Sequence, residues 1–136
     1  MIKQEFRLLR FAVCAVVLLF GNRLRAQTIF ASKLGSSSVW EIGQTGNILT
    51  ENFGITMNYP MGLALRNNHL FVAYGEAQTK VAEFDLNGTL INPVFASGFA
   101  TSPGKMEFDR NGNLYVIHAY EIAKFGPTGT LLNERL

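Results

Sequence analysis

Seven residues of this chain combine aromatic rings with carboxylate, amide and imidazole groups. Six of them lie in two segments at equivalent positions of a sequence repeat, and the seventh lies in another loop. They are Tyr59, Tyr74, Glu76, Gln78, His118, Tyr120 and Glu121. Rings of this kind stack on the apolar faces of a sugar or a peptide, and the polar groups fix its orientation. The set therefore predicts a binding surface for a protein, peptide or glycan, with ordinary solvated loop residues as the alternative.

The residue types and their spacing predict no catalytic residue, no metal site and no cofactor. His118 and Glu121 are two metal-ligand types, but no second cluster follows them at a ligand spacing. The run 109–113, DRNGN, looks like the start of a calcium-binding loop, yet its glycine comes too early and no bidentate glutamate follows. A hairpin turn explains this run, and we expect His118 to be hydrogen-bonded or exposed.

A repeat of 41 to 44 residues must position these side chains. Three glycines, three aromatic residues and two prolines each recur with nearly this spacing: Gly46, Gly88 and Gly129; Trp40, Phe84 and Phe125; Pro60 and Pro103. Several landmarks that share one period indicate a repeated structural unit.

Each complete repeat contains four short segments of alternating apolar and polar residues, separated by Gly, Asn, Asp or Pro. In the last copy these segments are KMEF, NLYVIH, EIAKF and TLLNE. Four consecutive antiparallel strands form one blade of a β-propeller, so the predicted fold class is all-β. Asn111 and Gly112 predict a tight hairpin turn, because both central residues of such a turn favour positive φ.

The last copy, SPGKMEFDRNGNLYVIHA, resembles NHL-type propeller repeats. The matching residues are Pro103, Gly104, Phe108, Asp109, Gly112, Asn113, Leu114, Tyr115 and Val116. The earlier copy departs from this pattern, because Arg66, Asn67 and Asn68 stand where an acid and a glycine are favoured. The chain is also similar to secreted bacterial propeller proteins of the PEP-CTERM-associated type, although the sorting tail of that group is absent here.

The N-terminal residues 1–26 read as a secretory signal. A basic opening precedes the apolar run FAVCAVVLLFG at 11–21, and a small residue, Ala26, marks the expected cleavage point. The run is shorter than the roughly 20 residues of a membrane-spanning helix. We therefore expect an exported protein, extracellular, periplasmic or associated with the cell envelope, and not held in a membrane after cleavage. The net charge is only +2, so the sequence gives no indication of a basic surface for nucleic-acid binding.

The mature region 27–136 is predicted to be a partial propeller. Residues 27–53 supply three strands of an incomplete blade, and 54–97 and 98–136 supply one blade each, about two and three-quarter blades in all. Closed propellers have about four to eight blades. The chain is therefore read as a piece of a longer propeller, as one copy of a self-associating ring, or as an open arc of three sheets.

Two functions remain open from the sequence. The first is a non-enzymatic binding module that uses the loop residues named above. The second is a fragment of a propeller hydrolase or lactonase similar to the gluconolactonase group, which would hold a divalent metal with Glu, Asn and Asp side chains. The expected innermost strands offer only Glu107 and Asp109, and Asp109 is already assigned to a turn. The sequence therefore favours the binding module.

Overall fold

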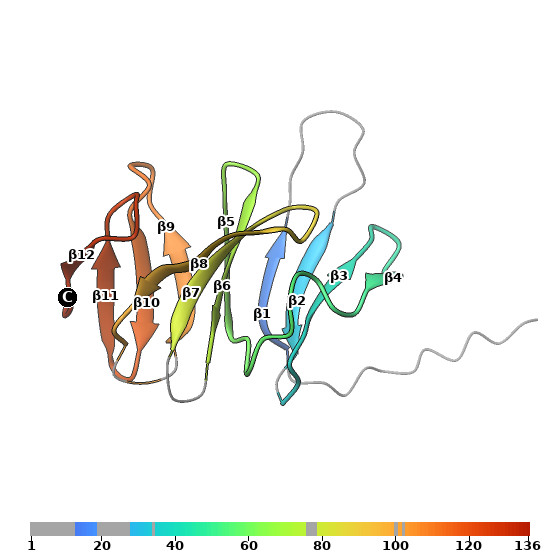
Figure 1. Ribbon diagram of the computed structural model, residues 1–136, viewed down its shortest axis with the longest axis horizontal. Helices are drawn as coiled ribbons and strands as arrows, with labels where there is room; N and C mark the ends of the chain where they lie inside the picture. The colour runs from blue at the N-terminus through green and yellow to red at the C-terminus, as the bar shows by residue number, and fades with distance from the viewer. Residues whose placement is uncertain (1–12, 19–27, 34, 76–78, 100, 102) are drawn as a thin grey trace, which may run out of the picture.

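The computed structural model describes residues 13–18, 28–33, 35–75, 79–99, 101 and 103–136. These residues form twelve strands in three antiparallel sheets, and no helix occurs among them (Figure 1). The all-β fold is confirmed, and it is a partial β-propeller. No helix within these ranges is long and apolar enough to cross a membrane.

Each sheet is a meander in which consecutive strands pair. The first sheet holds β1(Val13–Leu18), β2(Ile29–Lys33), β3(Val39–Ile42) and β4(Ile48–Thr50). The second sheet holds β5(Gly62–Arg66), β6(His69–Tyr74), β7(Lys80–Asp85) and β8(Leu90–Ser97). The third sheet holds β9(Pro103–Phe108), β10(Leu114–His118), β11(Glu121–Phe125) and β12(Leu131–Asn133). The innermost strands β1, β5 and β9 lie next to one another, as blades do around a propeller axis.

The opening blade differs from the expectation of three strands. Val13–Leu18, from within the predicted signal, pairs antiparallel with β2 and completes the first sheet as β1. The apolar, β-branched sequence VCAVVL suits a strand as well as a signal, which explains why the sequence pattern did not separate the two uses. The signal itself stays a prediction, and 1–12 and 19–27 lie outside the described residues.

The repeated glycines close equivalent turns. Gly46, Gly88 and Gly129 have φ of 81°, 86° and 83°, in the left-handed region that favours glycine. Each donates its N–H to the carbonyl three residues earlier, at 2.9, 3.2 and 2.9 Å. These turns join the third and fourth strands of each sheet, so the period read from the glycines is the structural period.

The aromatic alignment with Trp40 was wrong by two residues. Ile42 pairs with Ile29 on the neighbouring strand in the way that Phe84 pairs with Leu70. Trp40 instead pairs with Ala31, and its equivalent in the second sheet is an alanine. A shift of two residues keeps a side chain on the same face of a strand, so the alternation pattern alone could not detect the error.

The predicted Asn-Gly hairpin was also wrong in its geometry. Gly112 has φ of 80°, but Asn111 has no positive φ, and the loop spans 109–113 with Gly112 donating to the Asp109 carbonyl at 3.0 Å. The two-residue turn with positive φ at both positions lies in the second sheet, at Asn67 (52°) and Asn68 (62°). The residues that departed from the repeat pattern are therefore the ones that build the tighter turn.

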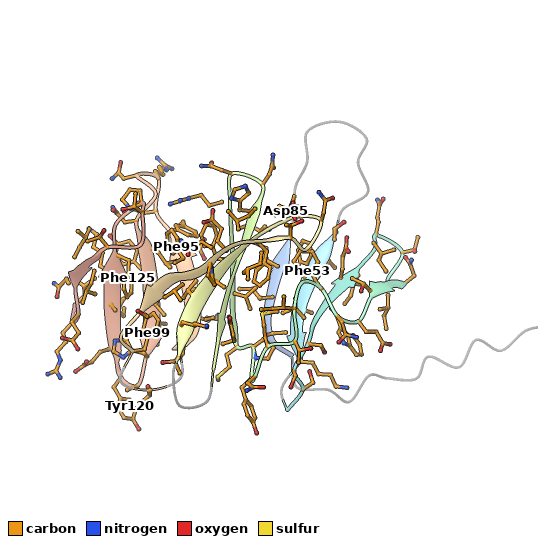
Figure 2. The ribbon with its side chains drawn as sticks, in the orientation of Figure 1. Phe53, Asp85, Phe95, Phe99, Tyr120 and Phe125 are labelled. Atoms are coloured by element: carbon orange, nitrogen blue, oxygen red, sulfur yellow. The ribbon has the colours of Figure 1, made fainter. Side chains whose placement is uncertain are left out.

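Two cores fill the spaces between the sheets. In β6, Leu70 and Val72 pack toward the first sheet, and Phe71 and Ala73 pack toward the third. Successive side chains of a strand point to opposite faces, so this central strand is buried on both. Aromatic rings sit in both cores, with Phe53 between the first two sheets and Phe95 and Phe125 between the last two (Figure 2).

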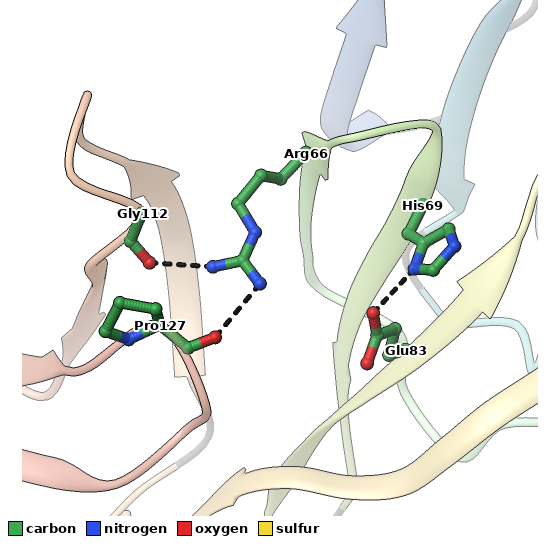
Figure 3. Close-up of polar contacts among 5 residues, drawn as sticks. All are labelled: Arg66, His69, Glu83, Gly112 and Pro127. Carbon is green, nitrogen blue, oxygen red and sulfur yellow. Dashed lines mark hydrogen bonds and ion pairs between the residues drawn. The ribbon is translucent and has the colours of Figure 1, made fainter.

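Arg66 joins the second sheet to the third at the end of the sheets that carries the hairpin turns. Its guanidinium donates to the Gly112 carbonyl at 2.7 Å and to the Pro127 carbonyl at 3.0 Å (Figure 3). It also lies 4.5 Å from the ring centroid of Phe108 and 5.4 Å from that of Phe71. These contacts hold the two sheets together through both charge and packing.

Candidate functional site

The candidate site is the end of the sheets opposite the Arg66 contacts. We call it the loop face, formed by the β2–β3, β6–β7 and β10–β11 connections with the β4–β5 and β8–β9 connections between sheets. The opposite end, with the hairpins β3–β4, β5–β6, β7–β8, β9–β10 and β11–β12, is called the turn end. In Figure 1 the loop face lies along the lower edge of the molecule and the turn end along the upper edge.

Two of the predicted residues present their rings to solvent on the loop face. Tyr120 is fully exposed and projects away from the third sheet (Figure 2), and Tyr59 is 46% exposed. Tyr59 (φ 50°) and Ala119 (φ 51°), which precedes Tyr120, both adopt the left-handed region. Such conformations disfavour side chains other than Asn, Asp and Gly, and they gather at ligand-contacting sites. The loop face thus holds two accessible rings, one on a residue in this conformation and one directly after such a residue.

His118, two residues before Tyr120, is the last residue of β10. It is only 2% exposed, its ring is 5.7 Å from that of Phe99, and neither ring nitrogen has a hydrogen-bond partner within the described part of the chain. An imidazole carries at least one N–H donor, and leaving it unpaired in a core costs about 1 to 3 kcal/mol. The expectation that His118 is hydrogen-bonded or exposed was wrong, because β10 turns its last side chain into the core.

The other predicted residues serve different roles. Tyr74 occupies the place in β6 that His118 occupies in β10 and is buried, with the Lys80 ammonium 5.3 Å from its ring centroid. Glu121 begins β11 and pairs with Arg135, whose Nε lies 3.2 Å from its carboxylate. Glu76 and Gln78 lie outside the described residues. Of the described predicted residues, Tyr120 and Tyr59 are therefore exposed, His118 and Tyr74 are buried, and Glu121 is partly exposed and paired with Arg135.

Hydrogen bonds across the sheets hold the loop face in place. The Thr79 hydroxyl lies 3.3 Å from the carbonyl oxygens of Phe99 and Thr101, which joins the β6–β7 loop to the β8–β9 connection. The Ser32 hydroxyl donates to the Met61 carbonyl at 3.1 Å and joins the first sheet to the second. No sequence pattern marked these two hydroxyls, because each bonds to a backbone carbonyl of a distant segment.

The turn end uses its carboxylates for structure. Asp109 accepts hydrogen bonds from the side chain and backbone of Asn113, both at 2.8 Å, and from the Asn111 N–H at 2.9 Å, and these donors lower its pKa. Asp85 has a lowered pKa for the same reason, chiefly because the Thr89 N–H donates to it at 2.7 Å. Both side chains are therefore committed to turns.

Within the described ranges, no group of three or more His, Cys, Asp or Glu side chains is placed to hold a metal ion. Glu107 is exposed on β9, opposite Tyr115 of β10, and Asp109 is engaged by its turn. The described residues by themselves therefore do not fit the divalent cation that the gluconolactonase-like resemblance implies.

Comparisons with known proteins show similarity in structure but not in sequence. The chain matches no family model. It also matches none of the curated proteins by sequence. A gluconolactonase from Xanthomonas campestris superposes with a TM-score of 0.64 and 21% identity, over 84% of this chain and 44% of that one. A protein of unknown function from Bacteroides caccae superposes with a TM-score of 0.61 and 17% identity, over 91% of this chain and 45% of that one.

These likenesses establish the class of the protein at the level of its fold. The chain is a three-sheet portion of a propeller, and it spans less than half the length of the solved chains that it matches. At identities of 21% and 17%, the shared feature is the arrangement of the sheets. Function on a propeller must be argued from the residues of the site, because one fold hosts many activities.

Proposed function

We propose that this chain is part of a gluconolactonase-like propeller and that its loop face binds a small polyhydroxylated ligand, an aldonic acid or its lactone. The observation that carries this proposal is the superposition of 84% of the chain on 44% of a gluconolactonase. Matching three consecutive sheets requires the same rotation from sheet to sheet, so the loop face of this chain corresponds to one end of that propeller.

The chemistry of the loop face supports a ligand of this kind. Sugar-like molecules have apolar C–H faces that stack on aromatic rings, and Tyr120 and Tyr59 present such rings. Two residues before Tyr120, the buried imidazole of His118 has no hydrogen-bond partner among the described residues. Because the described residues hold no set of metal ligands, the proposal assigns ligand contacts to this chain and derives no catalytic step.

The proposal is tested by titrating the full chain with D-gluconate in a calorimeter. We expect saturable binding that Tyr120→Ala weakens about tenfold, which is the loss of one stacking contact of roughly 1.4 kcal/mol. Leu49→Ala is the matched control, because Leu49 is 53% exposed on β4 and lies outside the loop face. Absence of saturable binding, or equal weakening by both variants, would refute the proposal.

A non-enzymatic module that binds a protein, peptide or glycan is the second candidate. It is favoured by the exposed tyrosines, which stand on the loop face without a group of metal ligands among the described residues. Lactone hydrolysis by the full chain, followed with and without Ca²⁺ or Mn²⁺, separates the two. Acceleration that needs the cation, together with a raised melting temperature in its presence, supports the enzyme. Binding of a peptide or glycan, with neither gluconate binding nor acceleration, supports the module.

A further inference from the structure

The apolar run 11–21 has two incompatible uses. Its position behind a basic opening and before Ala26 predicts an export signal. In the structure, Val13–Leu18 of the same run is β1, the innermost strand of the first sheet. An export signal offers its apolar residues to a membrane or an export machinery, whereas a sheet strand offers its backbone to a neighbouring strand. One copy of the segment does only one of these at a time.

The pairing of β1 with β2 is extensive for so short a strand. Ala15, Val16, Val17 and Leu18 pair in unbroken antiparallel register with Ser32, Ala31, Phe30 and Ile29. On its other side the segment lies against β5 of the second sheet. Without β1, the backbone groups on the inner edge of β2 would have no strand partner, and an unpaired edge of this kind accepts an added strand.

We infer that the inner edge of β2 is a strand-acceptor site and that its occupant is the chain's own segment Val13–Leu18, held there without need of a covalent connection. Backbone hydrogen bonds along the ladder supply the affinity. A cut in the chain between the segment and β2 would then leave the segment bound as a separate strand. This inference is independent of the proposed ligand site on the loop face.

Cys14 offers a direct way to follow the segment. It is the single cysteine of the chain, and the register shifts between Val13 and Ala15, so Cys14 is not one of the paired positions. A fluorescent label on this thiol therefore follows β1 and is attached at none of the paired positions. The full chain is given a site-specific protease sequence between Arg25 and Ala26, labelled, cut, and passed over a gel-filtration column.

We expect the label to elute with the large fragment after the cut. A large excess of unlabelled peptide 1–22 should then displace it, because the acceptor edge exchanges one strand for another. The same peptide carrying Val16→Pro and Val17→Pro should not displace it, since alternate N–H groups of a strand face its partner and one of these two prolines removes a bonded N–H. The peptide with Val16→Ile and Val17→Ile is the matched control that should still displace the label.

All peptides are compared on the same large fragment, so the folding of a variant fragment cannot account for a difference between them. Elution of the label as a free peptide directly after the cut would overturn the inference. Equal displacement by the proline and isoleucine peptides would overturn it as well, because it would show association without strand pairing.

Discussion

The two ends of the three sheets differ in how they use their polar and aromatic groups. At the turn end, Arg66, Asp85 and Asp109 each make several hydrogen bonds to backbone or side-chain partners. On the loop face, His118 is buried with no hydrogen-bond partner in the described part of the chain, and Tyr120 is fully exposed. Polar groups at the turn end thus stabilise the fold, whereas the loop face keeps unpaired and strained groups that a ligand can use.

The largest expected effect concerns the glycine turns of the turn end. A Cβ on Gly129 would lie 1.8 Å from the Phe95 carbonyl oxygen, and φ there is 83°. We expect Gly129→Ala to lower the free energy of unfolding by about 3 to 5 kcal/mol, from left-handed strain plus overpacking. Gly46→Ala is the matched control, since φ is 81° and no atom lies within 4 Å of its Cβ. It should lose only about 1 to 2 kcal/mol.

Urea denaturation of both variants measures this difference. Equal losses for Gly129→Ala and Gly46→Ala would mean that the Gly129 turn is not packed against the Phe95 backbone.

Arg66→Ala is expected to have the next largest effect. It removes two hydrogen bonds to carbonyl oxygens of the third sheet and the contact with the Phe108 ring, a loss of about 2 kcal/mol. Arg110→Ala removes an exposed arginine from the adjacent hairpin and should stay within about 0.5 kcal/mol of the parent. Thermal and urea melts of the two variants provide the measurement, and a neutral Arg66→Ala would remove the link between these sheets.

The two histidines give opposite expectations. His118→Leu replaces an unpartnered buried imidazole by an apolar side chain and should raise the free energy of unfolding by about 1 kcal/mol. At the turn end, the Glu83 carboxylate lies 2.6 Å from Nδ1 of His69. His69→Leu removes this partner and should lower the free energy of unfolding by about 1 kcal/mol.

Urea denaturation at pH 7 tests the sign of each change. If His118→Leu proved destabilising, His118 would have a structural role, and its place in the ligand site would be lost.

The smallest expected effect is the acid sensitivity of the turn-end carboxylates. The pKa of Asp109 lies below its ordinary value of 3.8 because the folded chain donates hydrogen bonds to the carboxylate. A lowered folded pKa gives stability that is present above pH 3.8 and is lost as the pH falls through the folded pKa. We therefore expect the urea midpoint of the parent to fall more between pH 5 and pH 3 than that of Asp109→Asn. Parallel curves for the two proteins would contradict this assignment.

Much of the fold could be predicted because its signals are local. The turns could be predicted because each needs a positive φ that glycine adopts readily, as at Gly46, Gly88 and Gly129. The strands between the turns could be predicted from their alternating apolar residues. The position of Trp40 along β3 was missed, because a shift of two residues leaves the alternation unchanged. The strand β1 was missed, because an apolar run behind basic residues suits a signal as well as a strand.

The site was less predictable because its features depend on distant contacts. The sequence placed His118, Tyr120 and Glu121 in one loop. It did not reveal that His118 is buried and Tyr120 exposed, since this depends on how β10 and its turn pack. Arg66 was noted only as a departure from the repeat. Its partners, Gly112 and Pro127, follow 46 and 61 residues later, and each offers a backbone carbonyl that no residue type reveals.

Hydrogen exchange of the full chain, with and without D-gluconate, tests the division between the two ends most directly. We expect the ligand to slow hydrogen exchange at the amides around Tyr59 and in the segment 118–121 of the loop face. The exchange rates of the turn-end amides of Gly88 and Gly112 should stay unchanged. Slowed exchange at the turn end, with none on the loop face, would contradict the claim that the loop face is the binding site.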